Sequence, residues 1–494
     1  MPLSAQTPNI SWNVNPFIDG KYTSSLADDL VDNINPATES ALCTFSQGNA
    51  EDLDVAVSVA RRRFEEGKWS RLPPAARAEV LQNLADLIEE HKEELALFDT
   101  LEMGKPTRAA VFDAGVTAPN KLRTTAVHVM QLLGQSTPLF DQTVSFNMFE
   151  PRGVVGLITP WNFPTVNAIT KLAPALAVGN SVVLKPSEIA PSSALRIAEL
   201  ALEAGIPEGV LNVVPGLGET VGAALALHPN VDLISFTGST RTGRSVMELC
   251  AKSNGKPVIL ECGGKSPHIV FQDTVNLDYV ATSVVQTAFA NSGQVCVATT
   301  RLLVHRAVKD VLLEKIVELA THIRPADPLD EKTEFGPLAS PAQRDRVDHY
   351  IQAGIADGAR AVVMGAVQRS GGCYVAPTIF DEVDGSMPIV REEIFGPVLC
   401  VQGFDDDAEA IAMANDTPFG LVATAWTRDC GLARQVAHAL RVGSVTVRTG
   451  GEEEAPSGIV LGREPQGHSG YGAELGVEGL KSFASLKLVT MMGA

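Results

Sequence analysis

The chain is poor in aromatic and in basic residues. Phe, Trp and Tyr make up 5% of its 494 residues, and 39 Lys and Arg stand against 58 Asp and Glu, which gives a net charge of −19. Such an acidic balance disfavours binding to nucleic acid, because the phosphate backbone requires a basic surface. No apolar run approaches the ~18 residues of a membrane span. The N-terminal residues show no basic stretch followed by an apolar one, so no secretory signal is readable.

Paired cysteines and spaced histidines are also missing. The seven cysteines are odd in number and contain no Cys-x-x-Cys pair, and the nine histidines show no His-x-x-x-His spacing. This pattern argues against a disulfide framework and a zinc site, and we predict no bound metal. Unpaired thiols fit a reducing compartment, which favours a cytoplasmic location. Most of these cysteines are expected to be buried packing residues, so the question is whether one of them is reactive.

The order of patterns along the chain indicates an α/β protein. Short strands and turns are expected over the first 50 residues, and helices with apolar residues at i, i+3 and i+4 over 50–133. From Val154 onward, Val- and Ile-rich runs alternate with helical segments, and a second such series begins near Lys265. We therefore predict two doubly wound parallel-sheet domains. Val144–Pro151 and the terminal segment SFASLKLVTM read as strands of an additional β-arm, and we expect them to pair across subunits.

One cysteine stands in a segment that could carry chemistry. Cys296 ends the sequence SGQVC, which we expect at the start of a helix or inside one. A helix N-terminus lowers the pKa of a thiol, and a thiolate can attack a carbonyl carbon. Taken alone, a single cysteine in an apolar context is more often structural. Covalent catalysis would also need a general base and a donor for an oxyanion.

Both partners have candidates at the ends of predicted strands. Glu261 ends the strand VIL and precedes two glycines, where it could act as a general base or only as a cap or ion-pair partner. Asn162, in ITPWNFP, could aim its amide at a developing oxyanion or only form a turn.

Two further segments could bind a dinucleotide. LISFTGSTRTG reads as strand, glycine turn and helix, with Gly238 and Ser239 where helix N–H groups can hold a phosphate. In KPSE, Lys185 and Glu188 follow another strand, where a carboxylate can accept both ribose hydroxyls. PGLGETVG is interpreted instead as a tight turn that opens a helix. Each of these signals is weak by itself.

Together, and in their order, the motifs resemble the aldehyde dehydrogenase superfamily. They are ITPWNFP, KPSE, FTGST, ECGGK, SGQVC and EEIFGPV, and FIDGKY, INPATE, LEMGKP, NDTPFGL and SGYGAELG extend the likeness over nearly the whole chain. The resemblance implies a dinucleotide-binding domain (1–135 and 153–260), a catalytic domain (261–445), an oligomerisation arm (136–152 and 472–494) and a substrate-mouth loop (446–471). It also implies a homodimer or homotetramer.

The resemblance implies oxidation of an aldehyde to a carboxylic acid with hydride transfer to NAD(P)⁺. Cys296 would attack the aldehyde, the Asn162 side chain and the Cys296 backbone N–H would hold the oxyanion, and water activated by Glu261 would hydrolyse the thioester. Glu188 should repel a 2′-phosphate, so NAD is expected over NADP, although neighbouring Lys185 leaves NADP open. The residues assigned to the cofactor are Ile158, Trp161, Lys185, Ser187, Glu188, Gly238, Ser239, Gly263, Glu393 and Phe395.

The sequence departs from the family pattern around the substrate. Cys262 replaces a leucine beside the base, Thr170 replaces a tryptophan, and PQGHSGYGAE is shorter than usual and lacks its lysine. The expected mouth residues are Asn167, Thr170, Val295, Val297 and Arg448. The acidic run Glu452–Glu454 raises the hypothesis of a mouth that prefers cationic aldehydes, although a solvated loop is the simpler interpretation.

Two other functions stay open from the sequence. The first is transfer of the acyl group to coenzyme A, which Glu261 disfavours because acylating members usually lack the glutamate base. The second is a non-catalytic protein on the same scaffold, which Cys296, Glu261 and Asn162 disfavour.

Overall fold

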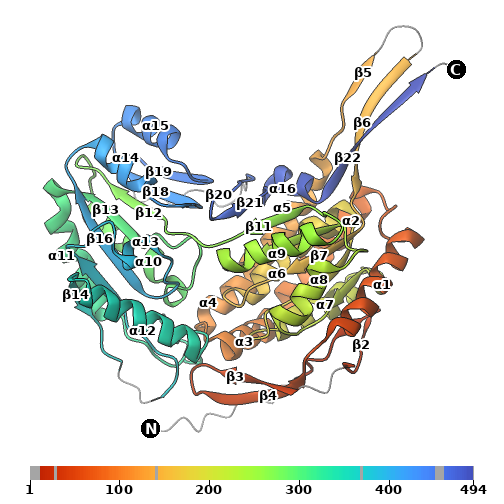
Figure 1. The fold of residues 1–494 in the computed structure, drawn as a ribbon, viewed down its shortest axis with the longest axis horizontal. Coiled ribbons are helices and arrows are strands. Elements are labelled where there is room, and N and C mark those ends of the chain that lie inside the picture. The colour runs from red at the N-terminus through yellow and green to blue at the C-terminus, as the bar shows by residue number, and fades with distance from the viewer. Residues whose placement is uncertain (1–11, 27–29, 139–142, 368–370, 451–460, 493–494) are drawn as a thin grey trace.

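The structure is a computed structural model, and it describes residues 12–26, 30–138, 143–367, 371–450 and 461–492. Figure 1 shows two α/β regions side by side and a narrow β-ribbon that projects from one of them. In the described part of the chain, no helix is both long enough and apolar enough to cross a membrane.

The first sheet has eight strands in the order β2-β1-β9-β8-β7-β10-β11-β21. Its five central strands are parallel and almost fully buried, as expected where helices cover both faces of a sheet. They are β7 (Val154–Ile158), β8 (Ser181–Lys185), β9 (Leu211–Val213), β10 (Leu233–Thr237) and β11 (Val258–Glu261). β8 and β9 lie on one side of β7, and β10 and β11 on the other. This reversal of strand order opens a crevice at the carboxyl ends of β7 and β10.

Short antiparallel strands complete the sheet, and helices connect its central strands. The edge strands are β1 (Phe17–Ile18), β2 (Lys21–Tyr22) and β21 (Gly470–Tyr471), and the helices are α6 (Pro164–Val178), α7 (Ser192–Glu203), α8 (Ala223–Leu227) and α9 (Thr240–Lys252). The turn predicted from PGLGETVG does open a helix, because a π-helical turn over Gly218–Gly222 leads into α8.

The N-terminal helices confirm the helical prediction over 50–133 and refine it. They are α1 (Ala50–Glu66), α2 (Pro74–Glu90), α3 (Lys92–Met103), α4 (Thr107–Phe112) and α5 (Ala118–His128), preceded by the hairpin β3 (Leu30–Asn35) and β4 (Ser40–Ser46). Asn49 begins α1 with a reciprocal capping box to Asp52. A π-helical turn over Asp113–Thr117 joins α4 to α5, which contacts both α2 and α6.

The second sheet has seven strands in the order β14-β15-β16-β13-β12-β18-β19, of which only β14 is antiparallel in the described part. The strands are β12 (Pro267–Val270), β13 (Arg301–His305), β14 (Arg360–Met364), β15 (Thr378–Asp381), β16 (Val398–Phe404), β18 (Val422–Trp426) and β19 (Ser444–Arg448). Its helices are α10 (Leu277–Phe289), α11 (Arg306–His322), α12 (Pro341–Ala356), α13 (Pro388–Arg391), α14 (Asp407–Asn415) and α15 (Cys430–Ala439). The small strands β17 (Phe419–Gly420) and β20 (Gln466–Gly467) pair with each other.

The ribbon consists of β5 (Ser136–Pro138), β6 (Thr143–Pro151) and β22 (Ala484–Met492). β22 pairs with β6 of the same chain along its whole length, and pairing of this ribbon across subunits stays a prediction. The helix α16 (Gly476–Ser482) packs on α5 and α6, so the segment before β22 lies outside the ribbon. The predicted mouth loop also begins too early, because β19 extends to Arg448.

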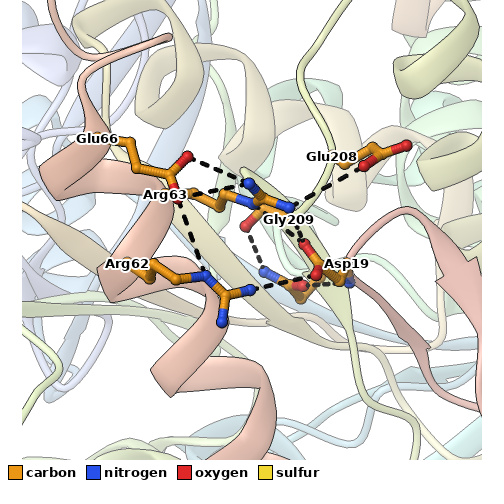
Figure 2. Close-up of polar contacts among 7 residues, drawn as sticks. Asp19, Arg62, Arg63, Glu66, Glu208 and Gly209 are labelled. Carbon is orange, nitrogen blue, oxygen red and sulfur yellow. Dashed lines mark hydrogen bonds and ion pairs between the residues drawn. The ribbon is translucent and has the colours of Figure 1, made fainter.

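A network of ion pairs attaches the hairpin of β1 and β2 to α1. Asp19, in the turn between β1 and β2, accepts hydrogen bonds from Arg63 at 2.8 Å and Arg62 at 3.2 Å (Figure 2). Its backbone has a positive φ of 54°, a conformation that Asp tolerates better than most residues. Gly209 lies so close that a Cβ there would be 2.6 Å from an Asp19 carboxylate oxygen. The network therefore fixes one edge of the first sheet.

Candidate active site

The crevice between β7 and β10 contains a cavity of about 780 Å³. Segments after β7, β10 and β11 form one wall, and residues of the second region, such as Gln343 and Phe395, form the other. The predicted residues that line it are Trp161, Asn162, Asn167, Gly238, Ser239, Gly263, Cys296, Glu393 and Phe395. The structure therefore brings together in one cavity candidates for nucleophile, oxyanion donor and cofactor contact.

The structure corrects the setting of Cys296. α10 ends at Phe289 and a 3₁₀ turn over Ala290–Gly293 follows, so Cys296 lies beyond the end of a helix instead of at its start. The predicted effect of a helix N-terminus on the thiol is therefore wrong. Burial, and then the carboxylates of Glu261 and Glu393, raise the pKa of Cys296 to about 12. In the free chain the thiol is protonated.

The backbone leading to Cys296 is held in an unusual conformation. Asn291, Ser292 and Gly293 have φ values of 49°, 57° and 75°, all in the left-handed region. A non-glycine residue there costs about 1–3 kcal/mol and persists only where its surroundings enforce it. Ser292 Oγ donates to the Gly336 carbonyl at 2.8 Å. A Cβ on Gly293 would lie 2.2 Å from the backbone of Gly396, so glycine is required there.

The Asn162 amide is fixed from both ends. Its Nδ2 donates to the Gln294 carbonyl at 2.9 Å, and its Oδ1 accepts from Asn167 Nδ2 at 3.2 Å. Asn291 Nδ2 donates to the Asn162 carbonyl at 2.9 Å, which ties the loop after β7 to the loop that carries Cys296. An amide has two N–H donors. One donor of Asn162 thus remains for an oxyanion at the cavity wall.

Glu261 is the last residue of β11, at the carboxyl edge predicted for it. It is 4% exposed, and its Oε1 has no hydrogen-bond partner among the described residues. Burial, followed by the carboxylate of Glu474, raises the pKa of Glu261 to about 8, while Arg463 and Lys171 oppose that rise. A carboxylate with a pKa near the working pH is an effective proton acceptor.

A buried ion pair beside Glu261 was not predicted from the sequence. Lys171 Nζ, on α6, lies 3.2 Å from Glu474 Oε1 and donates to Ser235 Oγ on β10 at 3.0 Å. Lys171 is 1% exposed. The available signal was the lysine itself, since it is the one charge in the apolar helix PTVNAITKLAPALAV and a buried lysine needs a partner.

The turn after β10 has the form expected of a phosphate site. Ser239 caps α9, and its Oγ accepts from the Thr242 backbone N–H at 3.1 Å. Gly238, Ser239, Thr240 and Arg241 line the cavity, so the first turn of α9, where helix N–H groups can hold a phosphate, borders it.

A second glycine brings two other predicted residues into contact. A Cβ on Gly263 would lie 2.0 Å from Glu393 Oε2, and Glu393 Oε1 accepts from the Gly264 backbone N–H at 3.0 Å. Burial raises the pKa of Glu393 to about 7. Across the cavity, the Trp161 and Phe395 rings meet edge to face with centroids 5.4 Å apart.

Lys185, Ser187, Glu188 and Ile158 lie at the same edge of the sheet without lining the main cavity. Ile158 and Lys185 are register partners at the ends of β7 and β8. Lys185 Nζ lies 3.1 Å from Glu188 Oε2, and the Glu188 side chain is 35% exposed. This carboxylate is thus available to a ribose. Together, these residues fit a dinucleotide.

The expected mouth residues are dispersed. Only Asn167 lines the cavity, whereas Thr170 donates to the Val166 carbonyl within α6, and Val295 and Val297 lie on neither of its walls. Arg448 stacks over Trp426 at 5.2 Å from the ring centroid, away from the cavity. Glu452–Glu454 lie outside the described residues.

Cys262 fits the packing interpretation. It is buried, and its sulfur lies where a Cβ on Gly243 would approach it to 2.7 Å. No cluster of three or more His, Cys, Asp or Glu side chains suited to a metal occurs in the described ranges.

Comparisons with known proteins agree with this geometry. The family model "Aldehyde dehydrogenase family" matches residues 22–489. The NADP/NAD-dependent aldehyde dehydrogenase PuuC of Escherichia coli is 40% identical over 96% of this chain and 94% of its own length. The aminoacetaldehyde dehydrogenase of Pseudomonas aeruginosa is 43% identical over 89% of this chain and 88% of its own.

Solved structures give the same result. The aldehyde dehydrogenase KauB from Pseudomonas aeruginosa superposes with a TM-score of 0.95 at 41% identity, over 99% of this chain and 98% of that one. The indole-3-acetaldehyde dehydrogenase AldA of P. syringae, a mutant in complex with NAD⁺ and IAA, gives 0.95 at 42% identity over 98% of each chain.

The contribution of Glu261 to the pKa of Cys296 can be measured by alkylation. Glu261→Gln removes a negative charge that raises the thiol pKa, so iodoacetamide should label Cys296 several-fold faster above about pH 8, where Glu261 is ionised. Below about pH 7 the two rates should converge. Rates from peptide mass spectrometry test this, with exposed Glu248→Gln as the control; slower labelling in Glu261→Gln would contradict it.

Proposed function

Because the chain belongs to the aldehyde dehydrogenase family and oxidises aldehydes to carboxylic acids with NAD(P)⁺, we propose that Cys296, Asn162 and Glu261 are its catalytic residues. The observation that supports this assignment most strongly is the bond from Asn162 Nδ2 to the Gln294 carbonyl, two residues before Cys296. This bond ties the Asn162 amide to the loop that carries Cys296, and both residues line one cavity, which supports the assignment.

In the first half-reaction, the Cys296 thiol loses its proton to solvent and its sulfur bonds to the aldehyde carbon, while the C=O π electrons move onto the oxygen to form a thiohemiacetal. The free N–H of Asn162 and the backbone N–H of Cys296 stabilise the oxyanion, and a lost oxyanion donor typically costs about 10²–10³ in rate. NAD(P)⁺, when bound, accepts the hydride, which leaves a thioester on Cys296. The Gly238 turn and the Glu393 carboxylate hold and orient the dinucleotide.

In the second half-reaction, Glu261 removes a proton from the water that attacks the thioester. The acid is released and Cys296 is restored. The carboxylate form is the active one, and burial raises the pKa of Glu261 to about 8. Hydrolysis should therefore accelerate as the pH rises through this value. A base so placed favours transfer to water over transfer to coenzyme A.

Glu261→Gln should separate the two half-reactions. We expect a burst of about one NADH per subunit, followed by a steady-state rate reduced about 10²- to 10⁴-fold, because a general base contributes this much. Stopped-flow absorbance measures both phases. Cys296→Ala should give no NADH with any aldehyde of a broad panel, whereas Cys262→Ala should retain activity. Unchanged steady-state turnover in Glu261→Gln would refute its role as the base.

We further propose that NAD is preferred over NADP. Glu188 lies three residues beyond the end of β8, is partly exposed and is paired to Lys185, so it would repel a 2′-phosphate. If the Glu188 carboxylate were removed, Lys185 would attract the 2′-phosphate of NADP.

Glu188→Gln should shift cofactor preference toward NADP by about tenfold, because removing a like charge near a phosphate is worth on the order of 1 kcal/mol. Ratios of kcat/KM for NADP and NAD at fixed aldehyde measure the shift. The matched control is Glu199→Gln, a helix carboxylate paired to Arg196. A constant ratio in Glu188→Gln would contradict the assignment.

The β-ribbon is proposed as the surface through which copies of the chain assemble into a homodimer or homotetramer. It exposes apolar side chains that a water-exposed ribbon would not retain: Val144, Met148, Leu486, Leu488, Met491 and Met492. The outer edge of β22 has no partner strand within the described residues. We also infer a reducing, cytoplasmic location, since all seven cysteines are unpaired.

Removing residues after Ala484 should lower the assembly mass to that of a smaller oligomer or a monomer. The cut spares Phe483 and Ala484, which are buried in the main core and whose loss would unfold the chain. Light scattering after size-exclusion chromatography measures the mass. Leu488→Lys, which keeps the strand, should have the same effect, and an unchanged mass in both variants would contradict the proposal.

A further inference from the structure

Two cations near the proposed catalytic residues form no ion pair with any described residue. Lys121 lies on α5. Arg463 lies just before β20, in the segment that leads on to β21 at the edge of the first sheet. Neither side chain forms a hydrogen bond or ion pair in the described part of the chain, and Arg463 Nε is buried without a partner. Both residues are partly buried, so a ligand of opposite charge that reached them would gain a charge-assisted contact in a partly desolvated setting.

Backbone pairing places Arg463 beside the catalytic cluster. Arg463 and Glu474 form an isolated antiparallel bridge in which each N–H donates to the other's carbonyl at 3.0 Å. Directly opposed residues of such a bridge project their side chains to the same face. Glu474 is held by Lys171, so the Arg463 guanidinium shares this face with the buried ion pair but is not joined to it.

Electrostatic effects agree with the backbone bridge in relating Arg463 to the reacting groups, and they relate Lys121 to Arg463 and Glu474. Arg463 acts to lower the pKa of both Glu261 and Cys296. Burial and then repulsion from Arg463 lower the pKa of Lys121, against the opposing effects of Glu474 and Asp113. Of the two carboxylates that attract Lys121, Glu474 is paired to Lys171, and Asp113 lies 2.6 Å from Lys105. Because Glu474 and Asp113 are paired elsewhere, Lys121 and Arg463 have no ion-pair partner among the described residues.

We propose that Lys121 and Arg463 form an anion subsite beside Cys296, and that the chain acts on aldehydes that carry a carboxylate at the end remote from the aldehyde group. This inference rests on the proposed function, because it requires Cys296 to be the residue that attacks the aldehyde. A guanidinium matches a carboxylate through two parallel N–H donors, and a second cation adds to that charge. The subsite binds the substrate and takes no part in the chemical step.

A matched substrate set tests the charge preference. Succinic semialdehyde and butanal share one chain length and differ in the terminal carboxylate, and betaine aldehyde supplies a cation. We expect the wild-type kcat/KM for succinic semialdehyde to exceed that for butanal at least tenfold, and betaine aldehyde to be the poorest substrate. The advantage should shrink as salt increases, because partly exposed charges are screened. A preference for butanal or betaine aldehyde would overturn the proposal.

Variants of Arg463 and Lys121 test whether a preference for the carboxylate-bearing aldehyde comes from these two side chains. Arg463→Gln should reduce kcat/KM for succinic semialdehyde about 10- to 100-fold, the range expected for a charged hydrogen-bond pair. Lys121→Gln should reduce it less, and Arg463→Lys should restore part of the loss. The butanal rate reports any change in Glu261 or Cys296, so the ratio of the two substrates isolates recognition. The control is Arg434→Gln, an exposed arginine on α15.

The two proposals fail in different ways. If wild-type protein forms NADH from butanal and the substrate ratio is the same in wild type, Arg463→Gln and Lys121→Gln, the subsite is refuted and the catalytic assignment stands. If Cys296→Ala still forms NADH from butanal, the catalytic assignment is refuted, and the subsite falls with it.

Discussion

The buried ion pair of Lys171 and Glu474 is the interaction on which the site depends. It joins α6, the centre of the first sheet through Ser235, and the C-terminal segment that leads to the ribbon. A buried pair repays its desolvation only with good geometry, and removing one partner leaves an uncompensated charge that costs about 3–5 kcal/mol. The ion pair also affects the pKa of Glu261. Glu474 promotes the rise in the pKa of that carboxyl, and Lys171 opposes it.

The nucleophile loop is held by a different means. Its left-handed residues store backbone strain, and the close approach of Gly293 to Gly396 excludes any side chain there. Hydrogen bonds from Ser292 and Asn291 maintain this conformation. Strain of this kind is retained where a precise geometry is needed. The thiol is thus positioned by packing between the two α/β regions, and burial together with the carboxylates of Glu261 and Glu393 raises its pKa.

Much of this organisation was predictable from the sequence, and the exceptions share a physical cause. Alternating strands and helices predicted both parallel sheets, and glycine turns placed Gly238, Ser239 and Gly263 at the cavity. The setting of Cys296 was mispredicted because α10 ends before three residues in the left-handed region, and the spacing of apolar residues does not reveal such a backbone change. Lys171 and Arg463 were missed because their roles depend on contacts with residues far away in the chain.

The net charge of −19 and the proposed anion subsite are compatible because electrostatic effects are local. At physiological salt, exposed charges farther than about 8–10 Å are largely screened, so the acidic surface sets solubility more than selectivity. Inside the crevice, low polarisability makes each nearby charge count for more. There, Glu474 is already neutralised by Lys171, and the pKa of Glu261 near 8 leaves much of that carboxyl protonated at neutral pH. Charge selection of the aldehyde is therefore proposed to depend on Lys121 and Arg463, the two cations near this site without an ion-pair partner in the described part of the chain, and not on overall composition.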